Sequence, residues 1–202
     1  MIFRFFDLIF IFILTPVFLL FYIVIYIYIY LTIGKPVIFI QSRSGYNGKI
    51  FKIYKFRTMS ILNVKRNKNK FFESDRQRVL KATKFLRRTR LDEIPQIYNV
   101  LRNDISFVGP RPLLPEYNNL YNKKQKKRLT VKPGITGWSQ LKGKKLKSWK
   151  KRFELDLWYI ENKSVYLYFK IIFLTFIYFI NILFDKNPRQ EILLHNRFNG
   201  KN

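Results

Sequence analysis

The sequence predicts a mixed α/β (α+β) fold in which an apolar N-terminal membrane helix precedes a small, helix-rich domain with a β-hairpin. Three observations predict it. The first 33 residues are almost all apolar, the hydrophobic period changes at Pro36, and short helix-like and strand-like segments separated by Pro, Gly and Asn follow. A chain of 202 residues suits one domain plus an appendage. We therefore divide it into a membrane element, residues 1–35, and one domain, residues 36–202.

Composition restricts the chemistry. The chain has 39 Lys and Arg against 12 Asp and Glu, a net charge of +27, which implies an anionic partner: nucleic acid, an acidic membrane surface or a phosphorylated substrate. The absence of Cys excludes disulfides, thiolate nucleophiles and Cys-type zinc sites. The single histidine, His195, lies near the C-terminus and is expected at the surface. A catalytic group must therefore be a carboxylate, Lys, Tyr or a hydroxyl.

The N-terminal segment from Phe5 to Ile33 predicts a retained membrane helix. No small-residue cleavage site follows it, so it is not a signal peptide. It is long enough to cross a hydrocarbon core of roughly 30 Å. Its polar interruptions are Asp7, Thr15 and Thr32, with Pro16 after the second.

Pro16 predicts a bend near the middle of this helix, because proline removes a helical hydrogen bond and clashes with the preceding turn. Arg4 and Lys35 place positive charge at both ends, which fits a helix that enters and leaves on the cytoplasmic side. On sequence physics alone, a kinked span is favoured over such a re-entrant hairpin.

A β-hairpin is predicted next. Val37–Ile40 and residues 50–57 read as strands around a turn at 46–49. Lys55 and Arg57 share one face of the second strand, where they would reach a phosphate or face water. Without further evidence, basic side chains on a strand more often face water than bind a phosphate.

A helix capped by Ser74 and Asp75 is predicted to follow a Lys- and Asn-rich loop. Its inner side would hold Val79, Ala82 and Leu86. That helix would bring the next stretch, residues 87–90, to the candidate site.

Two adjacent carboxylates, Asp92 and Glu93, follow this arginine-rich stretch. Pro95 is favoured in a first helical turn, so the pair is predicted at a helix start, where free N–H groups and the dipole keep both ionised at neutral pH. One carboxylate can attack phosphorus while its neighbour holds a hard cation over phosphate oxygens. The pattern favours phosphoryl transfer; the alternative is a helix cap with a surface ion pair.

A short helix with Ile97, Val100 and Leu101 on its buried face is expected to end at Asn103, before a strand over residues 105–108.

The strand leads into Gly109–Pro112. The prolines on either side of Arg111 restrict its backbone, with a cis bond as one means, and preorganise the guanidinium for phosphate.

The remaining segments are less specific. Residues 116–128 predict a basic helix, and 131–138 a turn-rich loop with Trp138 suited to ligand stacking or membrane contact. The polybasic run 142–152 suits solvent or lipid headgroups. Residues 165–184 predict an amphipathic helix lying at the membrane interface or on the domain, because one side carries Lys163, Lys170 and Asn181.

Taken together, the motifs resemble the bacterial sugar transferase family of monotopic polyprenyl-phosphate phosphoglycosyl transferases. Within it they are most similar to the small enzymes of protein N-glycosylation that transfer N,N'-diacetylbacillosamine 1-phosphate. The resemblance covers nearly the whole chain and rests on Thr15-Pro16, Lys55–Met59, Leu91-Asp92-Glu93, Phe107–Pro112, Pro133–Trp138, Phe153–Asp156 and Phe198–Asn202.

The resemblance implies transfer of a sugar 1-phosphate from a UDP-sugar to undecaprenyl phosphate, with UMP released. It makes Asp92 the nucleophile and Glu93 the ligand of Mg²⁺. Arg87 and Arg111 match phosphate-binding positions, and Asp156 matches an acidic residue whose role stays open.

The resemblance also implies a re-entrant helix broken at Thr15-Pro16, which reverses the preference for a span. Thr15 replaces the usual Ser and Asn103 a usual Gly; Thr still offers a hydroxyl, and Asn tolerates the helix-ending conformation. The implied location is the cytoplasmic face of a bacterial inner membrane. Implied partners are its phospholipids and downstream glycosyltransferases, with no nucleic acid.

Two other functions remain open from the residues. One is a membrane-tethered basic protein that binds nucleic acid or anionic lipid, supported by net charge and by aromatics such as Trp138 and Trp149 among lysines. A polyanion binder gains nothing from carboxylates at its most basic point, which counts against it. The other is an inactive family member acting as a scaffold, which the intact Asp92 and Glu93 disfavour.

Overall fold

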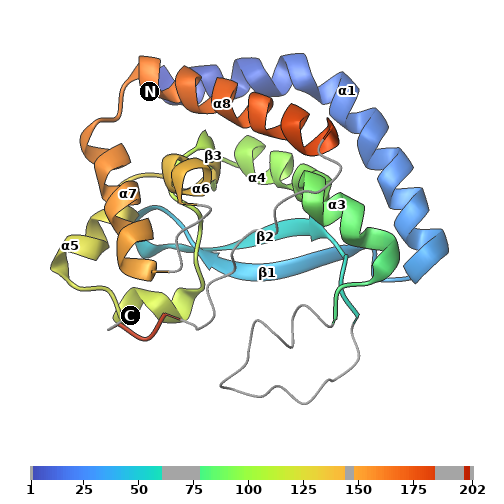
Figure 1. Ribbon diagram of the computed structural model, residues 1–202, viewed down its shortest axis with the longest axis horizontal. Coiled ribbons are helices and arrows are strands. Elements are labelled where there is room, and N and C mark those ends of the chain that lie inside the picture. Colours follow the sequence, from blue (N-terminus) through green and yellow to red (C-terminus); the bar gives the residue numbers. More distant parts are fainter. Residues whose placement is uncertain (1, 61–77, 144–147, 185–197, 201–202) are drawn as a thin grey trace.

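The computed structural model describes residues 2–60, 78–143, 148–184 and 198–200. Two long helices, α1 (Ile2–Ile33) and α8 (Val165–Phe184), lie along one side of the molecule, the upper edge in Figure 1. A β-hairpin lies on the opposite side, with short helices between the two. The predicted α+β class is confirmed.

Helix α1 continues through Pro16 and changes direction near its middle, where Figure 1 shows it turning from the upper edge down the right-hand side. Proline has no N–H, so the carbonyl of Phe12 lacks its usual helical donor. One residue earlier, the Thr15 hydroxyl donates to the carbonyl of Ile11 at 2.6 Å. The bend predicted from Thr15-Pro16 is present, and the helix is not interrupted there.

Both ends of α1 are attached to the same domain. Arg4 donates to the carbonyl of Leu101 at 2.9 Å, at the end of α4 (Ile97–Leu101). At the other end, Arg57 donates to the carbonyls of Ile33 at 2.9 Å and Gly34 at 2.7 Å. A cation there complements the negative end of the helix dipole.

Asp7 anchors the second turn of α1, although its neighbours in sequence are apolar. It is 2% exposed and accepts hydrogen bonds from the Ser106 hydroxyl at 2.9 Å, the Phe107 N–H at 2.9 Å and the Tyr168 hydroxyl at 2.7 Å. A buried carboxylate with these donors ties α1 to a strand of the domain and to α8.

The predicted hairpin is confirmed. Strand β1 (Ile38–Ser44) pairs antiparallel with β2 (Ile50–Phe56), and the turn between them places Asn47 and Gly48 in the left-handed region, at φ 51° and 76°. Such φ values favour Asn and Gly.

A second, two-stranded sheet was only half predicted. Strand β3 (Ser106–Val108) forms as expected and pairs in parallel with β4 (Gly134–Thr136). The prediction of a loop across residues 131–138 is therefore wrong at β4. Three residues beside a Pro-Gly pair carry no local strand signal, and only the distant partner makes them a strand.

The helix before the carboxylate pair begins later than predicted. Val79 pairs with Met59 in an isolated antiparallel bridge, so it is not helical. The helical segment consists of the 3-10 turn η3 (Lys81–Thr83) and α3 (Lys84–Thr89), and the proposed caps at 74–75 lie outside the described residues.

The predicted helix over residues 116–128 is broken into short pieces. These are the 3-10 turn η5 (Pro115–Asn119), α5 (Lys123–Lys126) and the 3-10 turn η6 (Lys127–Thr130). Asn122 starts α5 because its side chain accepts from the Gln125 N–H at 2.8 Å, while the Gln125 side chain accepts from the Asn122 N–H at 3.0 Å. This reciprocal cap begins a new helix where a continuous one was expected.

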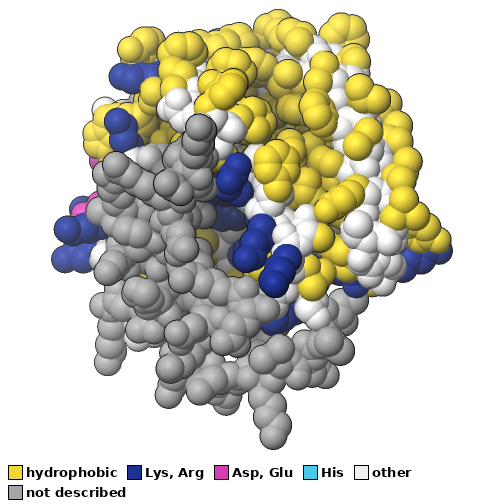
Figure 2. Space-filling model, turned by 45° about the vertical axis from the view of Figure 1, so that its right-hand side comes forward, with side chains coloured by type: hydrophobic (Ala, Val, Ile, Leu, Met, Phe, Trp, Pro, Cys, Tyr) yellow, Lys and Arg dark blue, Asp and Glu magenta, His cyan; other side chains and the backbone are white. Residues whose placement is uncertain are grey.

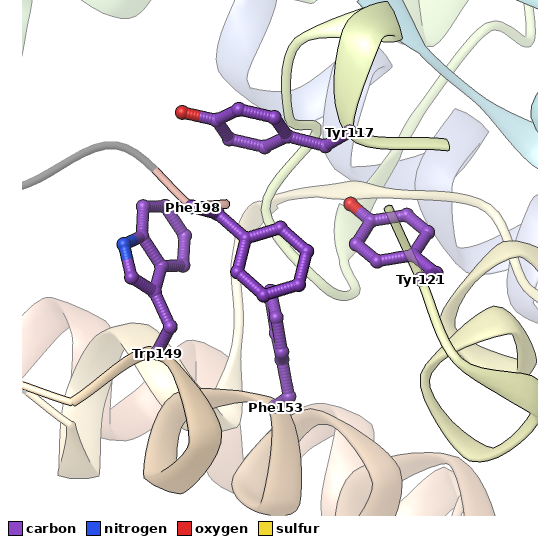
Figure 3. Close-up of a cluster of buried hydrophobic side chains, with 5 residues drawn as sticks. All are labelled: Tyr117, Tyr121, Trp149, Phe153 and Phe198. Atoms are coloured by element: carbon purple, nitrogen blue, oxygen red, sulfur yellow. The ribbon is translucent and has the colours of Figure 1, made fainter. Parts of the chain in front are cut away.

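An aromatic cluster packs residues 117 and 121 against the segments that follow β4 (Figure 3). Helices α6 (Trp138–Lys142) and α7 (Trp149–Glu161) follow β4, and two rings of α7 enter the cluster. The C-terminal Phe198, 2% exposed, lies among them. The members of the cluster are Tyr117, Tyr121, Trp149, Phe153 and Phe198.

The outer faces of α1 and α8 are apolar. By length and composition both helices could cross a membrane. Figure 2 shows hydrophobic side chains over the side formed by α1. Helix α8 packs on the domain through one face and exposes a second apolar face, which includes Tyr166, Phe169, Phe173 and Phe176. Exposed apolar surface of this extent indicates membrane association.

Candidate active site

The carboxylate pair lies in the first turn of a helical segment, as predicted. That turn is a 3-10 helix, η4 (Leu91–Gln96), which continues into α4. Arg90 lies between α3 and η4 with φ 59°, in the left-handed region, and its carbonyl accepts from the Glu93 N–H at 3.0 Å. The turn places Asp92 and Glu93 at the start of the segment, where the helix dipole stabilises negative charge.

Glu93 is surrounded by cations. It is 6% exposed, and its Oε1 lies 2.6 Å from Lys55 Nζ, 3.0 Å from Arg111 Nη2 and 3.9 Å from Arg90 Nη1. Burial alone would raise the pKa of Glu93, but Lys55, Arg111 and Arg90 hold it well below its usual range. Glu93 Oε2 is buried and has no hydrogen-bond partner among the described residues.

Asp92 differs from its neighbour. It is half-buried, and burial, followed by the negative charge of Glu93, raises the pKa of Asp92 to about 6, while Lys55, Arg87 and Arg90 act in the opposite direction. At pH 7 such a group is still ionised by about ten to one. Asp92 is therefore a partly accessible carboxylate, charged at neutral pH, in a strongly basic environment.

The structure separates the two basic residues of the second strand. Lys55 reaches Glu93, whereas Arg57 is buried at the C-terminal end of α1 and lies away from the pair. Lys55 and Arg57 were predicted on one face of the strand, but they bind different partners. Arg57 binds the carbonyl oxygens at the end of α1, whereas Lys55 binds Glu93.

Arg111 reaches the pair from the segment after β3. The peptide bonds before Pro110 and Pro112 are trans, so the expected option of a cis bond is not used. Gly109 is required by packing: a Cβ there would lie 2.4 Å from the carbonyl oxygen of Lys132. The close contact between the Gly109 backbone and residues 132–134 fixes the path of the chain from the end of β3 to Arg111.

Asp156 does not touch the pair. Its Oδ2 accepts from Arg128 Nε at 2.7 Å, and its Oδ1 accepts from the Ser139 hydroxyl. Arg128 in turn donates to the Tyr121 hydroxyl at 2.9 Å and to the backbone carbonyl of Arg111 at 3.1 Å. Asp156 is therefore connected to the site through Arg128, which donates to the Arg111 carbonyl.

Two further arginines lie near the pair. Arg87 is exposed on α3 and acts on Asp92 through its charge. Arg43, in β1, was missed by the sequence analysis; it lies near Arg111 and Glu93, and its Nη2 donates to Gln41 Oε1 at 2.6 Å. The alternation of the hairpin could have identified it, because Arg43 and Lys55 fall on one face.

The donor set of the site fits Mg²⁺. The described residues contain no group of three or more His, Cys, Asp and Glu side chains that would form a complete metal cage. Mg²⁺ usually takes one or two carboxylates and completes its shell with phosphate oxygens and water. Glu93 Oε2, which has no partner among the described residues, and the carboxylate of Asp92 could supply such ligands.

Comparison with known proteins identifies the family. Residues 1–181 match the family described as bacterial sugar transferase. The chain is 47% identical over 175 residues to the uncharacterized sugar transferase EpsL of Bacillus subtilis, covering 85% of this chain and 84% of that protein.

Longer relatives share the same region. The chain is 44% identical over 148 residues to the UDP-glucose:undecaprenyl-phosphate glucose-1-phosphate transferase of Escherichia coli, which covers 69% of this chain and 32% of that protein. It is 35% identical over 146 residues to the UDP-N-acetylgalactosamine-undecaprenyl-phosphate N-acetylgalactosaminephosphotransferase of Aeromonas hydrophila, 69% of this chain and 34% of that protein. The chain thus spans about a third of these longer proteins. The predicted membership of the family is confirmed: the chain belongs to the bacterial sugar transferase family and is a transferase enzyme.

Proposed function

We propose that the protein is a phosphoglycosyl transferase that moves a sugar 1-phosphate from a UDP-sugar to undecaprenyl phosphate and releases UMP. One observation carries the proposal. Asp92 is a half-buried carboxylate, ionised at neutral pH, beside a second carboxylate and within a group of Arg and Lys side chains. The printed names of the relatives from E. coli and A. hydrophila support the substrate classes.

The proposed reaction has two steps. A carboxylate oxygen of Asp92 attacks the sugar-linked phosphorus, the bond from that phosphorus to the bridging oxygen breaks, and its electron pair leaves with UMP. An oxygen of undecaprenyl phosphate then attacks the same phosphorus and releases the Asp92 carboxylate, which gives a lipid diphosphosugar. The covalent aspartyl phosphosugar splits one difficult transfer between a soluble donor and a membrane-bound acceptor into two easier ones.

The surrounding residues have distinct roles. Glu93 would hold Mg²⁺ through Oε2, while Lys55 and Arg111 fix its other oxygen. When bound, Mg²⁺ supplies positive charge to the diphosphate and assists the departure of UMP. Arg111 and Arg87 bind phosphoryl oxygens, because a guanidinium fits them bidentately.

The protein acts at the cytoplasmic face of a bacterial inner membrane, with α1 re-entrant. Support comes from the attachment of both ends of α1 to one domain, by Arg4 and Asp7 at the start and by Arg57 at the end. Because the chain has no Cys, a single cysteine at residue 2 or 35 labels one site with an impermeant reagent on oriented membranes. Both positions should label from the cytoplasmic side; labelling of residue 2 only from the periplasmic side would show a span.

The chemical step is tested by UMP release from a panel of UDP-sugars, with and without undecaprenyl phosphate. We expect a burst of UMP without acceptor, a labelled phosphosugar trapped on the protein, and loss of both in Asp92→Asn. If UMP appears only when both substrates are present and no protein species is trapped, the lipid phosphate attacks directly and Asp92 is at most an electrostatic group.

The same panel identifies the sugar. We expect a UDP-N-acetylated amino or diamino sugar to be the best donor, and the product to start a lipid-linked glycan that downstream glycosyltransferases extend. This expectation rests on the resemblance to the protein N-glycosylation enzymes. A chain that prefers UDP-glucose would contradict it while leaving the reaction class intact.

A further inference from the structure

Arg43 is a largely enclosed cation that has no carboxylate partner among the described residues. Its Nη2 donates to Gln41 Oε1 at 2.6 Å and its Nη1 to the carbonyl of Pro112 at 3.5 Å, so both acceptors are neutral. Its Nε is buried without a hydrogen-bond partner among the described residues, and none of the ion pairs found in that part of the chain includes it. Lys55, by contrast, has a carboxylate within hydrogen-bond distance.

The surroundings of Arg43 favour an added negative charge. Burial and then the positive charge of Arg111 lower the pKa of Arg43 to about 10, against the opposing effect of Glu93. A buried guanidinium that lies near a second positive charge is stabilised when an anion binds beside it.

The cations also follow one face of the hairpin. Arg43 lies opposite Phe51 in the register, and Lys55 is four residues further along the same strand as Phe51, so Arg43 and Lys55 point to the same side. Arg111 contacts Glu93 and continues into Pro112, which Arg43 contacts. Followed from contact to contact, the charged side chains beside this face come in the order Lys55, Glu93, Arg111 and Arg43.

We propose that Arg43 and Arg111 form a second phosphate-binding subsite, next to the phosphate that Asp92 attacks. The inference rests on the proposed function for the identity of its ligand, which is a terminal or bridging phosphate group. Either the phosphate that leaves as UMP or the phosphate of the lipid acceptor has this chemistry. A guanidinium is suited to it because its forked donors match phosphate oxygens.

The direct test is binding of inorganic pyrophosphate to the purified full chain in lipid nanodiscs, followed by calorimetry. Arg43→Gln should weaken binding about 10- to 100-fold, as expected for loss of a charged hydrogen bond. Arg43→Lys should restore part of it. The matched control is Lys52→Gln, which removes one positive charge from an exposed position on the other face of the hairpin and should bind as the wild type does.

The kinetic test assigns the phosphate. In the full reaction, varying one substrate while the other is saturating gives KM for the UDP-sugar and KM for undecaprenyl phosphate. An Arg43→Gln variant with a raised KM only for the UDP-sugar would place the UMP phosphate at the subsite, and one with a raised KM only for the lipid would place the acceptor phosphate there.

The proposal is overturned if Arg43→Gln binds pyrophosphate as the wild type does, with both KM values unchanged and only the thermal stability lowered. Arg43 would then be a brace for the Pro112 backbone. Failure of the proposed function looks different: a wild-type chain that binds pyrophosphate through Arg43 but releases no UMP from any UDP-sugar retains the subsite and lacks the reaction.

Discussion

Glu93 and Asp156 are both buried carboxylates paired with arginine, and they differ in what is left unpaired. Glu93 faces three cations through one oxygen, and its other oxygen has no partner in the described structure. Asp156 faces one cation, and both of its oxygens accept hydrogen bonds from Arg128 and Ser139.

This difference in hydrogen bonding fits a binding role for Glu93 and a structural role for Asp156. A buried polar atom without a partner costs stability, so Glu93 Oε2 is the atom that the proposed metal ion would satisfy, whereas both oxygens of Asp156 already have partners. Arg111 connects the two clusters: its side chain contacts Glu93, and its carbonyl accepts from Arg128. Changes at Glu93 should alter activity, and changes at Asp156 should alter stability first.

Among changes to the two carboxylates compared above, Glu93→Gln should have the largest effect. It should lower the rate of UMP release about 100- to 1,000-fold, comparable to the loss of one preorganised electrostatic contact. The amide keeps the shape but leaves Lys55 and Arg111 without their counter-charge, so stability should fall as well, and the rate is therefore measured per folded molecule. Full activity of Glu93→Gln, or of the wild type in excess chelator, would remove Glu93 from the metal role.

Asp156→Asn should chiefly destabilise the fold. It leaves the buried Arg128 without its counter-charge, a change that costs about 3 to 5 kcal/mol of unfolding free energy. Denaturant unfolding in detergent measures it, with Glu154→Gln, an exposed position on the same helix, as the control. An unchanged unfolding free energy together with lost activity would instead give Asp156 a part in the chemistry.

The pH dependence of the first step tests Asp92. The reactive form is deprotonated, and the pKa of Asp92 is raised to about 6, so the rate of UMP release should fall about tenfold per pH unit below 6 and level off above it. Glu93 does not cause this limb, because its pKa is held well below its usual range. A rate that stays constant from pH 5 to 7, with chemistry limiting, would argue against Asp92 as the nucleophile.

Ser139→Ala should give the smallest effect. It removes the hydroxyl donor from Asp156 Oδ1, so that one oxygen of this carboxylate lacks a partner, as Glu93 Oε2 does among the described residues. The change should cost about 1 to 2 kcal/mol of unfolding free energy. Activity per folded molecule should stay near that of the wild type, because Arg128 still holds the Arg111 carbonyl. A large loss of activity at unchanged stability would show that the two clusters are coupled more tightly than their contacts indicate.

Local features of this protein could be predicted because neighbouring residues decide them. Pro95 after two carboxylates sets a helix start, and the Asn47-Gly48 turn sets a hairpin, since both depend on backbone preferences of a few adjacent residues. The order of motifs along the chain likewise identified the family. These parts of the fold and of the site were available before any contact was known.

The sequence by itself determined the apolar helix with its bend at Pro16, the hairpin, and the carboxylate pair in a basic segment. The tertiary structure decided that Lys55 reaches Glu93 while Arg57 holds the end of α1, and that Asp156 supports Arg111 from behind. The physical reason is distance along the chain. Hydrogen bonds and ion pairs between residues tens of positions apart depend on how whole elements pack, and no local pattern encodes that choice.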